Sequence, residues 1–203
     1  MSVTSTATTR RTIQLPIDDG VVGLRGLSPQ RHRFELEYAL ERGSTANSVL
    51  FEAGDGAPAV LVHPPGVAYS AAFLPVLAEA LPSSDAPLLV VVGHVNPNRV
   101  ALLRDLAEAY AGLELIVSNP GAKLIEELWS QRKPAPPGET SEQPPLPDLP
   151  PLRVIRQEQT LPLSHQRSLM LLPAPTPRWP GGLLAFEESL GLLMSDKFFS
   201  AHL

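Results

Sequence analysis

The hydrophobic pattern of this chain changes near residue 64, and that change limits the folds the chain can adopt. Before this point, short apolar segments are separated by turn residues, and Asp55-Gly56 between two of them is a hairpin signal. In Phe34–Tyr38, apolar and acidic side chains alternate, as in a half-buried strand. The pattern predicts an antiparallel meander with strands Thr12–Pro16, Val21–Leu24, Phe34–Tyr38, Ala46–Glu52 and Ala59–His63.

After residue 64, continuous apolar runs alternate with segments of helical spacing. Leu88–Val92 is entirely apolar, which is typical of a strand buried on both faces. The order of strand and helix repeats, which favours parallel pairing of the strands. The predicted helices are Ser70–Leu81, Asn98–Tyr110 and Pro120–Trp129, and the predicted strands are Leu88–Val92 and Leu113–Val117.

A proline-rich segment, residues 131–151, follows the last of these helices. It holds eight of the 23 prolines and predicts an extended, solvent-exposed insertion. Three further strands follow it, over Leu152–Arg156, Arg167–Leu172 and Leu183–Glu187. The whole pattern indicates an α/β (α+β) class, with two sheets forming a sandwich and helices packed outside. One domain covers residues 12–203, after a disordered N-terminal segment over residues 1–11.

The composition excludes several classes of function. The chain has 203 residues, 43% of them hydrophobic, with a net charge of -5 and a pI near 5.5. Such a chain folds, but it lacks the basic patch of a DNA- or other nucleic-acid-binding surface. The sequence contains no cysteine, which removes disulfides and thiolate sites and suits a reducing compartment. We therefore expect a cytoplasmic protein without a membrane span.

The segment Gly93–Arg99 has the spacing of a metal-binding loop but holds few residues able to bind a metal. A His-x-Glu-x-Asp-His loop would offer four ligands, whereas these positions here read His94, Asn96, Asn98 and Arg99. Simpler interpretations also fit: the two asparagines are common in turns and helix caps. Arg178 can stack on Trp179, and Asp196 can lie in a turn.

Six segments, in the same order along the chain, resemble one known family. The chain is similar to the N-terminal metallo-β-lactamase-like domain of flavodiiron proteins, in particular the diflavin flavoproteins of oxygenic phototrophs. The similarity runs from about Thr12 to the end, outside the proline-rich segment. The six segments are Arg33–Tyr38, Gly43–Ser48, Gly93–Arg99, Ser118–Ala122, Thr176–Pro180 and Asp196–Phe199.

The resemblance implies an αβ/βα sandwich with a di-iron site. It also implies FMN on a flavodoxin-like domain and FAD on a flavin-reductase-like domain. In the family, NAD(P)H or ferredoxin supplies electrons that reduce dioxygen to water, and a head-to-tail dimer places the flavin of one subunit against the iron of the other.

The ligand positions of that family are mostly substituted in this chain. Of these positions, His94 and Asp196 are retained, while the others hold Asn96, Asn98, Arg99 and Arg178. Amides are poor ligands for iron, and a guanidinium only donates hydrogen bonds and repels a cation. We therefore expect no iron and no catalytic residue. We expect the two arginines to occupy the site, one of them pairing with Asp196.

The resemblance also covers only the first part of the family's architecture. The flavodoxin-like and flavin-reductase-like domains are absent from the sequence, so we expect no flavin site in this chain. The leading interpretation is a flavodiiron-type oxidoreductase domain that is inactive alone. The alternatives are a dimerisation module for an iron-containing paralogue, as a homo- or heterodimer, and a remnant without function. Another metal at His63, His94 or Asp196 would lack a full ligand set.

Overall fold

A seven-stranded sheet forms the centre of the molecule. The computed structural model describes residues 10–31, 33–34, 37–38, 43–81, 83–131 and 145–198. The strand order is β1-β2-β5-β6-β7-β8-β9, antiparallel from β1 to β6 and parallel from β6 to β9. The strands are β1 (Arg11–Asp18), β2 (Val21–Ser28), β5 (Ser44–Phe51), β6 (Ala59–Val62), β7 (Leu88–Val92), β8 (Leu113–Ser118) and β9 (Leu152–Ile155).

Helices cover one face of this sheet. A short 3-10 helix, η1 (Val67–Tyr69), leads into α1 (Ser70–Ala80), which packs against β1 and β2. Farther along the sheet lie α2 (Pro97–Ala109) and α3 (Asn119–Trp129), the latter against β8 and β9. Side chains of the helices and the sheet form one apolar core, which includes Phe73, Leu103 and Ile125. No described helix has the length and apolar character needed to cross a membrane.

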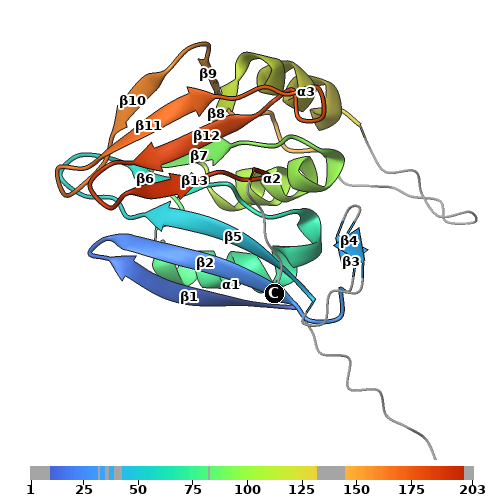
Figure 1. Ribbon diagram of the computed structural model, residues 1–203, viewed down its shortest axis with the longest axis horizontal. Coiled ribbons are helices and arrows are strands. Elements are labelled where there is room, and N and C mark those ends of the chain that lie inside the picture. The colour runs from blue at the N-terminus through green and yellow to red at the C-terminus, as the bar shows by residue number, and fades with distance from the viewer. Residues whose placement is uncertain are drawn as a thin grey trace, which may run out of the picture.

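A four-stranded antiparallel sheet covers part of the opposite face. Its strands are β10 (Gln159–Pro162), β11 (Ser168–Pro173), β12 (Leu183–Glu187) and β13 (Leu192–Met194). Figure 1 shows this sheet in front of β6 to β8, with β1 and β2 beside it rather than behind it. A second apolar core lies between the two sheets and includes Val91, Ile116 and Leu171. All five residues of β7 are buried because both of its faces are covered, as its apolar run predicts.

The meander and the helical half are confirmed, with the three predicted helices within about one residue of their observed ends. Asp55 and Gly56 have positive φ values of 52° and 80° in the turn between β5 and β6, which confirms the hairpin. The predicted strand Phe34–Tyr38 is wrong. It is replaced by two short strands, β3 (Arg33–Phe34) and β4 (Glu37–Tyr38), that pair with each other.

The proline-rich segment is only partly described, since residues 132–144 lie outside the described part. Its end, residues 145–151, has no regular structure but is not solvent-exposed throughout, which corrects the prediction. Pro150 is buried, Leu149 packs against the helix-side core, and the indole of Trp129 donates to the Pro147 carbonyl at 2.8 Å. Of the N-terminal segment predicted to be disordered, residues 1–9 are not described, while Arg11 already pairs with Leu27 in β1.

Candidate functional site

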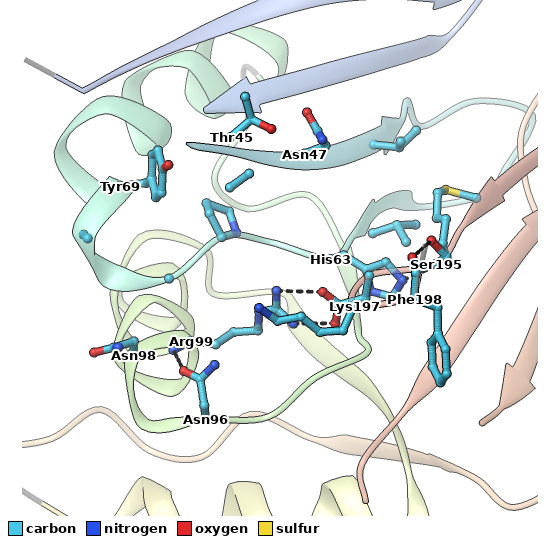
Figure 2. Close-up of a pocket in the computed structure, with 18 of the residues that line it drawn as sticks. Thr45, Asn47, His63, Tyr69, Asn96, Asn98, Arg99, Ser195, Lys197 and Phe198 are labelled. Atoms are coloured by element: carbon cyan, nitrogen blue, oxygen red, sulfur yellow. Dashed lines mark hydrogen bonds and ion pairs between the residues drawn. The ribbon is translucent and has the colours of Figure 1, made fainter. Parts of the chain in front are cut away.

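A pocket of about 530 Å³ lies at the edge of the sheet where β6 and β7 end. In parallel strands the carboxyl ends share one edge, where α/β proteins place their ligands. His63 directly follows β6, and the loop after β7 leads to Asn96 and α2. The segment after β13 brings Asp196 to the same place, where Figure 2 labels its neighbours Ser195 and Lys197.

Arg99 and Asp196 form a bidentate ion pair in this pocket. Arg99 Nη1 donates to Asp196 Oδ2 at 2.7 Å, and Nη2 donates to Oδ1 at 3.1 Å. Nη1 also donates to the His94 carbonyl at 2.7 Å. Both side chains are 10% exposed, so the pair is largely removed from water. Asp196 is therefore held through both carboxylate oxygens, as the dashed lines in Figure 2 show.

The cap of α2 determines where Arg99 lies. Asn96 has an extended backbone, and its side-chain oxygen accepts a hydrogen bond from the Arg99 amide at 2.9 Å. Pro97 occupies the first helical position, where no amide hydrogen is needed. The simpler interpretation of Asn96 as a helix cap is thus confirmed. The cap fixes the first turn of α2 with the Arg99 side chain directed toward Asp196.

His63 lies beside the ion pair and is 4% exposed. Its Nε2 is 3.1 Å from the Met194 carbonyl oxygen, which can only accept, so Nε2 carries the ring proton. Nδ1 is then an acceptor, and among the described residues it has no hydrogen-bond partner. Burial lowers the pKa of His63, and Arg99 lowers it further, while Asp196 acts in the opposite direction. The ring is therefore neutral near pH 7.

Opposing influences act on Asp196. Burial on its own would raise the pKa of this carboxyl group, but the positive charge of Arg99 outweighs it, helped by His63 at the low pH where that ring is protonated and by the hydrogen bonds from Arg99. The net result is a pKa well below the usual 3.8. Asp196 therefore stays ionised wherever the protein is folded under ordinary conditions.

The backbone around these two residues is unusual. His63 and Asp196 have φ values of 56° and 51°, in the left-handed region that non-glycine residues seldom occupy. Gly93 separates them: a Cβ at this position would lie 2.7 Å from both His63 Cε1 and Asp196 Oδ2. Such strain persists where surrounding contacts enforce it, and it is concentrated at functional sites.

The other predicted site residues do not all reach the pocket. Asn98 is exposed and lines it, whereas the His94 ring packs edge-on against Trp179, with centroids 6.4 Å apart. Arg178 is exposed, and its Cζ lies 5.8 Å from the centre of the Trp179 ring. The prediction that one arginine pairs with Asp196 is confirmed for Arg99. The prediction that Arg178 also occupies the site is wrong, because its side chain lies outside, over the indole ring.

Several pocket residues were missed as a group by the sequence prediction. Arg31, Asn47 and Tyr69 all line the pocket, although they come from three separate segments. His63 was considered only as a possible ligand for another metal. Its place directly after the buried strand β6 was the usable signal, because the carboxyl end of such a strand borders this edge.

The donors present do not fit a di-iron centre. Across the described ranges, no group of three or more His, Cys, Asp or Glu residues is placed to hold a metal ion. Both oxygens of Asp196 already accept from Arg99, and a guanidinium beside them opposes a cation. Iron needs several carboxylate or imidazole donors together, whereas neutral amides occupy the loop positions here.

Comparison with known proteins gives consistent relatives, although no protein-family model matches the chain. Diflavin flavoprotein A 6 of Nostoc sp. (strain PCC 7120) is 35% identical over 189 residues, which cover 93% of this chain and 30% of that protein. The chain thus spans about 30% of the length of the curated relatives it matches.

Two solved structures share both fold and sequence with the chain. The metal-soaked flavodiiron core of Flv1 from Synechocystis sp. PCC6803 is 31% identical with a TM-score of 0.77, covering 96% of this chain and 44% of that one. A fragment, residues 1-254, of diflavin flavoprotein A 5 from Nostoc sp. PCC 7120 is 30% identical with a TM-score of 0.79. That match covers 97% of this chain and 69% of the fragment.

Proposed function

We propose a function from the premise that this chain belongs to the flavodiiron proteins, as a homologue of the metallo-β-lactamase-like N-terminal part of the cyanobacterial diflavin flavoproteins. It is an oxidoreductase-family domain in which an ion pair replaces the metal. The family role, electron transfer from NAD(P)H or ferredoxin through flavin to dioxygen, is then not performed by this domain alone. The lack of cysteine suits the cytoplasm as its location.

The observation that carries this proposal is the buried pair of Arg99 and Asp196. A carboxylate at a retained ligand position can bind a metal ion only if its oxygens are not already occupied by other partners. Here both oxygens accept charged hydrogen bonds, at 2.7 and 3.1 Å. A metal ion would have to displace the guanidinium, which would leave a buried cation without its partner. The substituted Arg99 thus occupies the retained carboxylate of Asp196, which supports the exclusion of iron.

The test is the iron content of the full 203-residue chain after purification and after anaerobic incubation with ferrous iron. We expect far less than one iron per chain, and no oxygen consumption with added flavin reductant. A variant carrying Asn96→Glu, Asn98→Asp and Arg99→His restores three ligand types at the loop and should retain more iron than the native chain. Near-stoichiometric iron in the native chain would overturn the proposal.

A second candidate function is that of a non-catalytic partner for an iron-containing flavodiiron chain. It is favoured by the site itself, in which a cap, a bidentate pair and a buried histidine keep the pocket ordered without metal ligands. The test is co-purification of the tagged chain with an intact flavodiiron protein from a cyanobacterial host. Recovery of the chain without such a protein would argue against this function.

A further inference from the structure

The charges at the pocket are matched within the protein. Arg99 and Asp196 bind each other through two hydrogen bonds, at 2.7 and 3.1 Å, and both side chains are only 10% exposed. Burial lowers the pKa of His63 and keeps its ring neutral. Arg31 and Lys197 also border the pocket, and each has an interaction of its own. A charged ligand at Arg99 or Asp196 would therefore have to separate an existing pair, which would leave a buried charge without its partner.

Uncharged polar groups also line the pocket. Thr45 and Asn47 are two residues apart on β5, so their side chains lie on the same side of this strand, as Figure 2 shows. Asn98, in the first turn of α2, lines the pocket as well. Asn47 and Asn98 are exposed, so their amides can reach a bound molecule. An amide offers both hydrogen-bond donors and an acceptor, and it therefore suits a ligand group that also offers both.

Another part of the lining is apolar. Val49 lies on the same side of β5 as Asn47, and it pairs with Val62 of β6. Met194 belongs to the same apolar cluster as these two valines. Leu193 of β13 borders the pocket and is 44% exposed. A molecule that covers Leu193 removes apolar surface from water, which favours binding.

The pocket is large enough for an organic molecule. Its volume of about 530 Å³ lies within the range of about 300–1,000 Å³ that is typical of small-molecule sites. Such sites combine an apolar lining with a few polar groups that fix the orientation of the ligand. Here the polar groups open to a ligand are amides and a hydroxyl, since the buried charges already bind each other. The lining thus selects by hydrogen bonding rather than by charge.

We propose that this pocket binds a small uncharged molecule in which an amide group is attached to an apolar ring. The amide group of the ligand exchanges hydrogen bonds with the side chain of Asn47, and the ring packs against Val49 and Leu193. The inference rests on the proposed function, because a metal ion at Asp196 would break the ion pair on which the preference for an uncharged ligand depends.

Three probes of the same shape but different charge test this assignment. NMR titration of the full chain with benzamide, benzoate and benzamidine compares a neutral, an anionic and a cationic ligand. We expect benzamide to bind with a Kd of about 5 mM or tighter and to shift the side-chain amide signals of Asn47. Benzoate and benzamidine should bind at least about tenfold more weakly, because each brings a charge that the pocket cannot pair without separating Arg99 from Asp196.

Matched variants show where the amide of the ligand lies. Asn47→Asp keeps the shape of the side chain but replaces its donors with a negative charge. It should weaken benzamide about tenfold and make benzamidine the tightest of the three probes. Asn119→Asp adds the same charge at the start of α3, outside the pocket, and should leave the order of affinities unchanged. Leu193→Thr should weaken benzamide about threefold, because it removes apolar surface from the lining.

Three outcomes would each overturn the inference: a charged probe that binds as tightly as benzamide, no saturable shift with benzamide, or an Asn47→Asp variant that keeps the order of affinities of the native chain. Iron content measured on the same samples separates the two proposals. Iron-free protein that does not bind benzamide contradicts this inference alone, whereas near-stoichiometric iron contradicts the proposed function.

Discussion

Arg99 and Asp196 are buried together, and burial determines what such a pair contributes. Each charge is costly to remove from water, so loss of one partner leaves the other uncompensated. We expect Arg99→Met to lower the free energy of unfolding at pH 7 by about 3–5 kcal/mol. Urea titrations of the native chain and the variant measure this difference. The physical reason is the ionised Asp196 that remains, only 10% exposed, without its cation.

The matched control is Arg153→Met, since Arg153 also holds a carboxylate through two bonds. Its Nε and Nη2 donate to Glu114 at 2.9 and 2.8 Å, but the side chains are 41% and 27% exposed. Water screens that pair, so its loss should cost no more than about 1 kcal/mol. Equal losses in the free energy of unfolding for the two variants would show that burial of the Asp196 pair does not increase its contribution to stability.

The same pair predicts a dependence on pH. The pKa of Asp196 is depressed in the folded state, so the pair contributes fully above the unfolded value near 4 and is lost as pH falls below it. The destabilisation caused by Arg99→Met should therefore shrink as the pH falls, beginning above about pH 4, because burial without Arg99 raises the pKa of Asp196 in the variant. Burial lowers the pKa of His63, so folded protein also loses stability below about pH 6.5. That loss should be smaller in the variant, because Arg99 no longer lowers the pKa of His63 while Asp196 still raises it.

The start of α2 determines where the Arg99 side chain lies in the site. The Asn96 cap orients the first turn and so directs Arg99 into the pocket. We expect Asn96→Ala to reduce stability by about 1 kcal/mol, whereas Asn96→Asp keeps an acceptor and should be at least as stable as the native chain. Asn98→Ala is the matched control, with a change within about 0.5 kcal/mol because Asn98 is exposed. If both alanine variants cost the same, the cap is not the cause.

The elements that were predicted correctly have strong local signals. The apolar run of β7 and the helical spacing of α2 identify both elements without tertiary information. β10 and β13 were not predicted, because they have only four and three residues and depend on pairing with β11 and β12. The hairpin of β3 and β4 was read as one strand for the same reason: alternation cannot show where a short strand reverses.

The site was less predictable than the elements around it. The resemblance placed Arg99 and Asp196 at neighbouring ligand positions, and the structure joins them although they lie 97 residues apart. The contact of His63 with the same pair depends on Gly93 and on left-handed backbone at His63, neither of which has a local sequence signal. Arg178 was predicted to occupy the site, but its side chain lies over the ring of Trp179, its neighbour in the sequence.

The two covering layers of the whole molecule determine how its stability is distributed. Strands β6, β7 and β8 lie between the helices and the second sheet, so their backbone hydrogen bonds open only in large unfolding events. β1 is an edge strand in which Leu15 and Ile17 are 38% and 41% exposed. We therefore expect the slowest amide exchange in β7 and β8 and the fastest strand exchange in β1, as measured by hydrogen–deuterium exchange with mass spectrometry.

The Arg99→Met variant makes this prediction specific to the site. The ion pair joins α2 to the segment after β13, two parts that otherwise belong to opposite layers. Its loss should speed exchange at the start of α2 and in residues 195–198, while exchange in β8 changes only by the global loss of stability. Uniform acceleration across all strands would mean that the pair acts through global stability alone. Acceleration confined to these two segments would identify the ion pair as the contact that holds α2 against the segment after β13 at the pocket.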